Sequence, residues 1–320
     1  MKKTRILAIL AASVMVLTSC GKADLKETAV ETKGISVSAG DVATFIMAYS
    51  GEDNFDSAKE GIAKSVKENI EFIALGKAMD LELTEQDKLQ ASTIRSQLAS
   101  SNGGFKAFKK YLENNGSSIE FYDMLGEGSL YSTKVSEKIN EAIGETEATD
   151  EELKAFYDEH YYRAKHILIS IDDDTDEKAA EKLANEYLER AKGGEDFDAM
   201  IKELSEDPGS ETNPDGYTFT DGEMVKEFEE TVKSLKSGEF GICKSTYGYH
   251  VILRLDLGDF EAEKSSVSNA YSDSKYDAEF DKLLKEYNIE VKLYDDVIKS
   301  LKADMLSEMP KTDDSLGMSF

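Results

Sequence analysis

The segment "YYRAKHILIS", residues 161–170, has the pattern of a short β-strand. Successive side chains of a strand point to opposite faces, so its residues divide into two sets. One face carries Ala164, His166, Leu168 and Ser170, and the other carries Lys165, Ile167, Ile169 and Ile171. The pattern predicts a strand over 163–171 and places a titratable ring, His166, on one of its faces.

A second strand pattern, "TYGYHVILR" at 246–254, also carries a histidine near its start. His250 shares a predicted face with Ile252 and Arg254. If the two strands are neighbours in one sheet, His166 and His250 meet. A single histidine at a strand start more often has a structural role, so the functional hypothesis depends on the pair.

The residues between these strands predict a compact α+β domain. An acidic turn, "DDDTDE", leads into a helix that ends at the glycine pair 193–194, and a short helix opened by Asp196 follows. Next come the loop "SEDPGSETNPDGYTF" at 205–219, a third helix ending near Gly238, and two strands. The expected order is β-α-α-loop-α-β-β.

Five segments of this region occur in the order and with the spacing of parvulin-type peptidyl-prolyl isomerases. They are "AKHILI", "SEDPGS", "FTDGEMVKEFEE", "LKSGEF" and "YGYHVILR". Residues 161–257 therefore resemble that family, which implies an FKBP-like βαααββ fold. With the segments described below, the whole chain resembles the PrsA-type foldase lipoproteins of Gram-positive bacteria, in which a parvulin domain is inserted in a mainly helical, SurA-like chaperone domain.

The resemblance implies roles for individual residues. His166 and His250 match the family's paired active-site histidines, and Asp207 stands where parvulins have a cysteine or an aspartate. The implied substrate-binding residues are Met224 and Phe228 of the proline pocket, Phe219, Ser245 and Tyr247.

One motif departs from the family pattern. The usual "GGDLG" reads "NPDGY" at 213–217, so a common leucine of the pocket wall is Gly216. Tyr217, the next residue, is the candidate to fill the space.

Isomerase chemistry suits these residue types. Rotation about a peptide C–N bond costs about 18–20 kcal/mol because the bond has partial double-bond character. No bond is broken, so neither a nucleophile, a metal nor a cofactor is expected. The catalyst must hold the proline ring and favour the twisted amide over both planar forms, with Asp207 orienting the two histidines beside the carbonyl.

The N-terminus has the layout of a secretory signal peptide over residues 1–19, with a positive end and an apolar run too short to span a bilayer. "LTSC" at 17–20 resembles the lipobox of bacterial lipoproteins, which implies cleavage before Cys20 and its lipidation. An ordinary signal peptide with an incidental cysteine is the alternative. The expected location is the outer face of the cell membrane of a Gram-positive-type bacterium, with a tether over 20–37.

The net charge limits the classes of molecule that the chain is expected to bind, and the cysteine content limits its disulfides. The formal charge is −27, and removal of residues 1–19, with three cationic side chains, lowers it to −30. Such a chain repels phosphate backbones, so nucleic acid is not an expected partner. Lipidated Cys20 leaves Cys243 without a partner, so no disulfide is expected.

The flanking regions predict helices. Three capping-box patterns, Thr84 with Asp87, Ser117 with Glu120 and Thr149 with Glu152, open candidate helices. We expect a helical foldase domain over 38–158, the parvulin domain over 159–258, and C-terminal helices over 259–309 that pack back on the first domain. The tail 310–320 is expected to be disordered.

Two functions fit these patterns. The first is a prolyl isomerase that assists unfolded or partly folded secreted proteins, as a monomer or a homodimer. The second is a weak or inactive isomerase that holds clients through its helical domain, a hypothesis that Gly216 keeps open. A solute-binding lipoprotein is disfavoured, because residues 38–158 lack the alternating βα pattern of such lobes.

Overall fold

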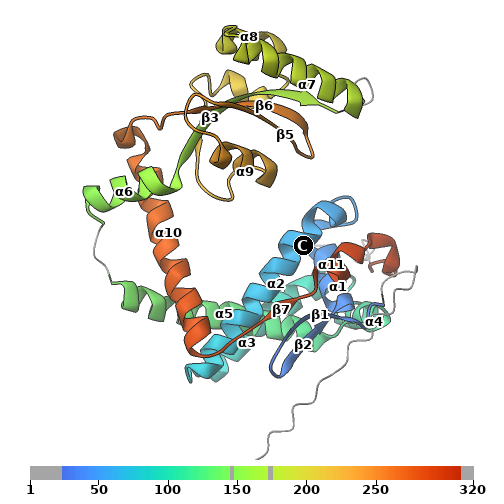
Figure 1. Cartoon of the computed structure of the whole chain (residues 1–320). Coiled ribbons are helices and arrows are strands. Elements are labelled where there is room, and N and C mark those ends of the chain that lie inside the picture. Colours follow the sequence, from blue (N-terminus) through green and yellow to red (C-terminus); the bar gives the residue numbers. More distant parts are fainter. Residues whose placement is uncertain (1–23, 145–147, 172–175, 311–320) are drawn as a thin grey trace, which may run out of the picture. The chain divides into compact units, whose positions relative to one another are not determined.

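The computed structural model describes residues 24–144, 148–171 and 176–310. The signal peptide, Cys20, residues 172–175 of the acidic turn and the tail from 311 lie outside these ranges. Chain contacts divide the molecule into a middle unit, Gly144–Asp277, and a split unit formed by the residues before and after it. Each unit combines helices with a small sheet (Figure 1), so the predicted α+β class is confirmed.

The middle unit follows the predicted order of elements, with two additional short elements in the segment predicted as a loop. Its elements are α6 (Asp150–His160), β3 (Tyr162–Ser170), α7 (Glu177–Lys192), α8 (Phe197–Leu204), the 3-10 turn η1 (Pro208–Glu211), β4 (Tyr217–Phe219), α9 (Lys226–Ser234), β5 (Phe240–Lys244), β6 (Gly248–Leu255) and the first part of α10 (Phe260–Glu286). The described strands form an antiparallel sheet in the order β4-β3-β6-β5. The short strand β4 was missed by the sequence analysis, which treated it as loop.

Successive side chains of β3 point alternately into two hydrophobic cores, one on each face of the sheet. Ile167 and Ile169 pack with Val251 under α7 and α8. On the opposite face, Ala164 and Ile252 pack with the apolar residues of α9 and β4. Figure 1 shows α7 and α8 on one side of this sheet and α9 on the other. The two histidines of the sequence pattern lie on the α9 side.

The split unit contains a second sheet and most of the long helices. Its elements are β1 (Thr28–Thr32), β2 (Ile35–Ser38), α1 (Ala39–Ser50), α2 (Phe55–Ala78), α3 (Glu85–Ser101), α4 (Phe105–Asn114), α5 (Ile119–Ile143), the end of α10, β7 (Lys292–Leu293), α11 (Asp295–Ser300) and the 3-10 turn η2 (Ala303–Met305). The described strands form a sheet in the order β2-β1-β7. Val297, Ile298 and Leu301 enter the same core as α1, α2 and α5.

The tether predicted over 20–37 is wrong for its second half. Residues 28–38 form β1 and β2, and Ala29 and Val30 are fully buried. The pairing that stabilises β1 comes partly from β7, where Val30 lies opposite Leu293. A short polar strand whose partner is far away in the chain has no periodic pattern of its own, so the local sequence read as a tether.

The predicted boundaries around the middle unit also need correction. Helix α6 and the start of α10 share a small core of Leu153, Tyr157, Tyr161, Phe260 and Val267. Residues 144–158 and 259–277 therefore belong to the middle unit, whereas the prediction gave them to the helical domain and the C-terminal helices. From Ala278 onward α10 belongs to the split unit, where Phe280 stacks near Phe72 with ring centroids 4.8 Å apart.

Two of the three predicted capping boxes form. The side chains of Thr84 and Thr149 cap α3 and α6 in this way. The box predicted at Ser117 is wrong: its hydroxyl donates to Asp41, and Ser118 accepts from the Phe121 N–H at the start of α5. A tertiary contact has shifted the cap by one residue.

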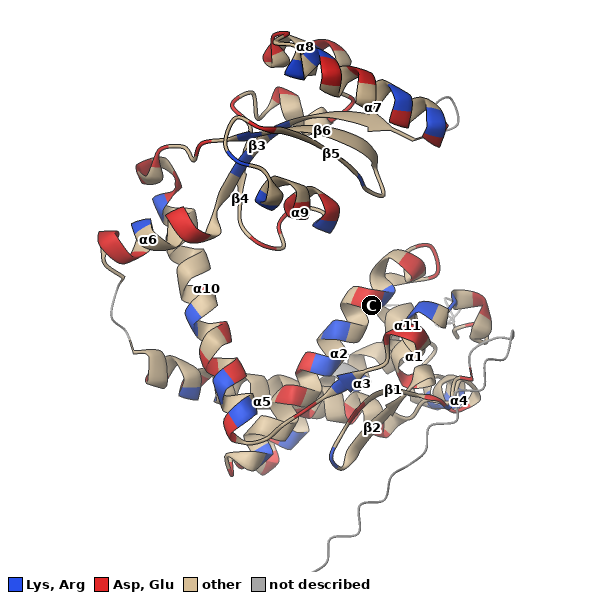
Figure 2. Ribbon diagram, in the orientation of Figure 1, with Lys and Arg blue, Asp and Glu red and all other residues tan. Residues whose placement is uncertain are grey.

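Charged residues are unevenly distributed between the helices and the larger sheet. Figure 2 shows acidic and basic residues interspersed along the helices, while the strands of the larger sheet carry few of them. Over the described ranges, no helix is both long and apolar enough to cross a bilayer.

Candidate active site

The two strand histidines lie side by side. Strands β3 and β6 are antiparallel neighbours, with His166 opposite Ile252 and His250 opposite Leu168. Because directly opposed residues share a face, the two histidines are diagonal neighbours on the α9 side. Their ring centroids are 5.1 Å apart. The structure thus brings together the pair that the two strand patterns suggested.

Both rings are buried and poor in polar partners. His166 is 9% exposed and His250 is 5% exposed. The Nδ1 atom of each ring is buried and makes no hydrogen bond to any residue of the described ranges. Burial lowers the pKa of His166, an effect that Asp207 partly opposes. Burial, reinforced by His166, lowers the pKa of His250 from 6.5 to about 4. Both imidazoles are therefore neutral at neutral pH.

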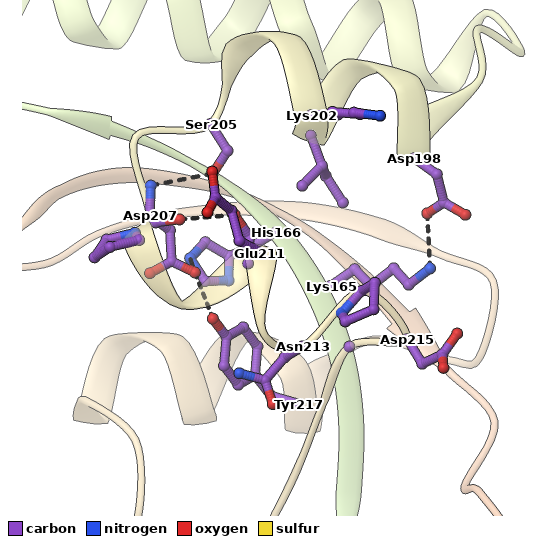
Figure 3. Close-up of a pocket in the computed structure, with 15 residues that line it drawn as sticks. Lys165, His166, Asp198, Lys202, Ser205, Asp207, Glu211, Asn213, Asp215 and Tyr217 are labelled. Carbon is purple, nitrogen blue, oxygen red and sulfur yellow. Dashed lines mark hydrogen bonds and ion pairs between the residues drawn. The ribbon is translucent and has the colours of Figure 1, made fainter.

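Asp207 approaches the pair from the loop before η1. Its Oδ2 lies 3.5 Å from His166 Nε2, and its Oδ1 accepts a 3.1 Å hydrogen bond from the Gly209 N–H. The Tyr217 hydroxyl donates a 2.6 Å hydrogen bond to the same Oδ2 (Figure 3). The sequence analysis assigned Asp207 to the site but missed this bond, and only the "NPDGY" departure drew attention to Tyr217.

Ser245 approaches the pair from the other end. Its hydroxyl and His250 Nε2 share a 2.7 Å hydrogen bond, and the Tyr247 N–H donates to the same oxygen at 3.1 Å. Ser245 is buried, whereas the Tyr247 ring is exposed. Ser245 therefore holds one histidine from the turn between β5 and β6, and the exposed ring of Tyr247 lies in the same turn.

Phe228 of α9 forms the apolar floor of the site. Its ring centroid lies 5.2 Å from that of His166 and 5.7 Å from that of His250. Met224 is half-buried beside it, in the same apolar cluster. The ring of Phe228 thus has the two histidines and Met224 as neighbours.

The predicted substrate contact of Phe219 needs correction. Phe219 is 1% exposed and packs behind Phe228, with ring centroids 5.9 Å apart. Pairing of β4 with β3, which sets Phe219 opposite Tyr162, turns this ring into the core. Phe219 lies behind Phe228 and supports the floor of the site.

Glu229 of α9 is a site residue that the sequence analysis missed. Its buried Oε1 accepts hydrogen bonds from the backbone N–H groups of Gly222 and Met224, at 2.8 and 3.0 Å. These bonds fix the loop that carries Met224. A glutamate within "MVKEFEE" has no local feature that distinguishes it from its exposed neighbours.

An open cleft of about 710 Å³ adjoins the histidine–aspartate side of the site. His166, Asp207 and Tyr217 line it, together with Lys165, which pairs with Asp198 at 2.7 Å (Figure 3). The five predicted substrate-binding residues are not among its lining residues. Within the described ranges, no group of His, Cys, Asp and Glu side chains is placed to hold a metal ion.

Comparison with known proteins bears directly on this arrangement. The family model described as "PPIC-type PPIASE domain" matches residues 151–256, which contain both histidines and Asp207. The foldase protein PrsA of Geobacillus kaustophilus (strain HTA426) is 30% identical over 308 residues, covering 91% of this chain and 95% of that protein. The chain belongs to the PrsA foldase family. The resemblance drawn from the five segments is confirmed.

Other relatives agree with membership of the PrsA family. Foldase protein PrsA 4 of Bacillus cereus (strain ATCC 14579) is 30% identical over 271 residues, or 83% of each chain. Among solved structures, a PrsA peptidylprolyl isomerase of Bacillus anthracis is 22% identical, covering 70% of this chain and 97% of that one, with a TM-score of 0.33. Family membership therefore rests on the sequence relatives.

Proposed function

We propose that this PrsA-family chain is a peptidyl-prolyl cis–trans isomerase that assists the folding of secreted proteins outside the cell membrane, where a lipid on Cys20 anchors it. The observation that carries the catalytic part is the buried His166–His250 pair, with ring centroids 5.1 Å apart, beside the ring of Phe228. The matching parvulin domain and the PrsA relatives support it.

The mechanism is non-covalent. A planar amide carries partial charges through resonance, and the twisted amide loses them. A site that excludes water and places neutral imidazoles beside the carbonyl therefore favours the twisted form. Phe228 and Met224 receive the proline ring, Ser245 orients His250 through its hydrogen bond, and the Asp207 carboxylate lies 3.5 Å from His166 Nε2.

A chromogenic prolyl-peptide assay tests the activity. We expect the full chain to accelerate isomerisation, and His166→Ala to lower turnover by about tenfold or more, the effect of losing about 1.4 kcal/mol of transition-state stabilisation. His160→Ala is the matched control, because this third histidine lies on α6, partly exposed, against Phe156.

Equal isomerisation rates with and without the wild-type chain contradict the proposal. If the chain then still suppresses aggregation of a reduced, unfolded test protein, the holding function in the helical domain becomes the better account of the molecule.

Lipid anchoring is tested by labelling growing cells with an alkyne-bearing fatty acid. We expect the full-length chain to incorporate the label and to fractionate with membranes, since two or more acyl chains anchor a protein stably. Cys20→Ser should lose both properties. Cys243→Ser, the control at the other cysteine, should keep both. Label retained in Cys20→Ser contradicts the assignment.

A further inference from the structure

We propose that Tyr217 is a positioning residue that holds the Asp207 carboxylate away from His166 and thereby keeps this imidazole neutral. The kinetic consequence of this inference rests on the proposed isomerase function. The effect on the protonation of His166 does not.

The distances around Asp207 Oδ2 carry the inference. The Tyr217 hydroxyl lies 2.6 Å from this oxygen, whereas His166 Nε2 lies 3.5 Å from it. Hydrogen bonds from ring N–H groups to oxygen are normally 2.7–3.2 Å long, so the tyrosine makes a strong bond and the histidine does not. The other carboxylate oxygen is occupied by the Gly209 N–H. Tyr217 therefore holds this oxygen at a place beyond hydrogen-bond distance of His166 Nε2.

The backbone explains why a tyrosine reaches this place. Tyr217 lies opposite Ala164 on the neighbouring strand, so its ring is the diagonal neighbour of His166, with centroids 5.7 Å apart. Gly216 has a φ of +95°, and a Cβ there would lie 2.8 Å from the Ala164 carbonyl oxygen. A leucine at position 216 would collide with the Ala164 backbone. The side chain that faces His166 is therefore that of residue 217.

The ionisable groups around His166 come from few elements. Asp207 faces it from the loop before η1, Tyr217 from β4 and His250 from β6, while α9 presents the apolar Phe228. Helices α7 and α8 pack on the opposite face of β3, where Asp198 pairs with Lys165. On β5, Cys243 lies opposite His250, and burial raises the pKa of its thiol to about 11.

These groups determine whether loss of the Tyr217 hydroxyl raises or lowers the pKa of His166. Burial and the Asp207 carboxylate raise the pKa of Tyr217, so its hydroxyl keeps its proton and remains a donor at neutral pH. Without this hydroxyl, the Asp207 carboxylate is no longer held in place and can turn until Oδ2 accepts a hydrogen bond from His166 Nε2. A carboxylate at hydrogen-bond distance favours the imidazolium, so the pKa of His166 should rise.

The test is an NMR titration of the three histidines in the full chain. We expect Tyr217→Phe to raise the pKa of His166 by about one unit, the smaller end of the effect of an adjacent opposite charge. The rise should vanish in the double variant Tyr217→Phe with Asp207→Asn. Tyr249→Phe, which removes a hydroxyl on the opposite face of β6, should leave His166 unchanged. An unchanged pKa in Tyr217→Phe, or a rise that persists without the carboxylate, overturns the inference.

Kinetics add a second readout. In Tyr217→Phe the fall of turnover at acidic pH should begin at higher pH, displaced by the same amount as the pKa of His166. A uniform loss of turnover at every pH indicates a purely structural role for Tyr217 and contradicts the inference. If the wild-type chain shows no turnover at all, the proposed function fails, and the titration still decides the role of Tyr217.

Discussion

Phe228→Ala is expected to lower the stability of the middle unit by about 3–5 kcal/mol, the usual cost of removing a buried phenylalanine, and to abolish prolyl turnover. The ring is 3% exposed and touches His166, His250 and Phe219. Its loss leaves a cavity beneath both histidines and removes the apolar contact for the proline ring.

A matched variant on the other face of the sheet separates these two effects. Phe197 of α8 is also buried and packs edge-on against Phe240, with ring centroids 5.1 Å apart. Phe197→Ala should cost a similar amount of stability and leave turnover per folded molecule intact. Because stability is not uniform across a structure, the stability of the middle unit is best followed by hydrogen exchange of β3 and β6 amides in urea. Full turnover in Phe228→Ala contradicts the assignment of the site.

Gly248→Ala is expected to destabilise the middle unit by about 3 kcal/mol or more, through backbone strain and overpacking together. Gly248 opens β6 with a φ of +138°, and a Cβ there would lie 2.1 Å from the Ile169 carbonyl oxygen. Either β6 moves away from β3 or the turn before it rearranges. Ser245, which exchanges backbone hydrogen bonds with Gly248, then loses its position at His250.

Gly238→Ala is the control for strain without a clash. Gly238 has a φ of +82°, and a Cβ there meets nothing within 4 Å. Its replacement should cost only about 1–2 kcal/mol, the cost of a left-handed conformation for an alanine. Urea unfolding followed by the same amide exchange compares the two variants, and equal losses contradict the argument from the close approach of the two strands.

The histidine pair could be predicted because its evidence is local. The alternation of apolar residues along β3 and β6 determines which face of the sheet each histidine ring lies on. Antiparallel pairing of these two strands then brings the two rings next to each other. Strand β4 spans only Tyr217–Phe219, too short to show a period, so neither the inward turn of Phe219 nor the bond from Tyr217 to Asp207 could be foreseen. Both depend on a backbone path that Gly216 permits.

Pairing over long distances also escaped the sequence analysis. Nothing in residues 28–38 indicates that β7, far along the chain, lies beside β1. The shared core of α6 and the start of α10 was missed for a similar reason, since each helix alone fits a helical domain. Domain boundaries follow such contacts and not the local composition.

The pairing of β1 with β7 also sets an order of assembly. A ribosome makes β1 early and β7 near the end, so β1 pairs first with β2 and gains its second neighbour only when Leu293 lies opposite Val30. The uninterrupted middle unit can complete its contacts while the first helices still wait for α11 to close their core. The first half of the split unit thus lacks part of its sheet and core for as long as the end of the chain has not been made.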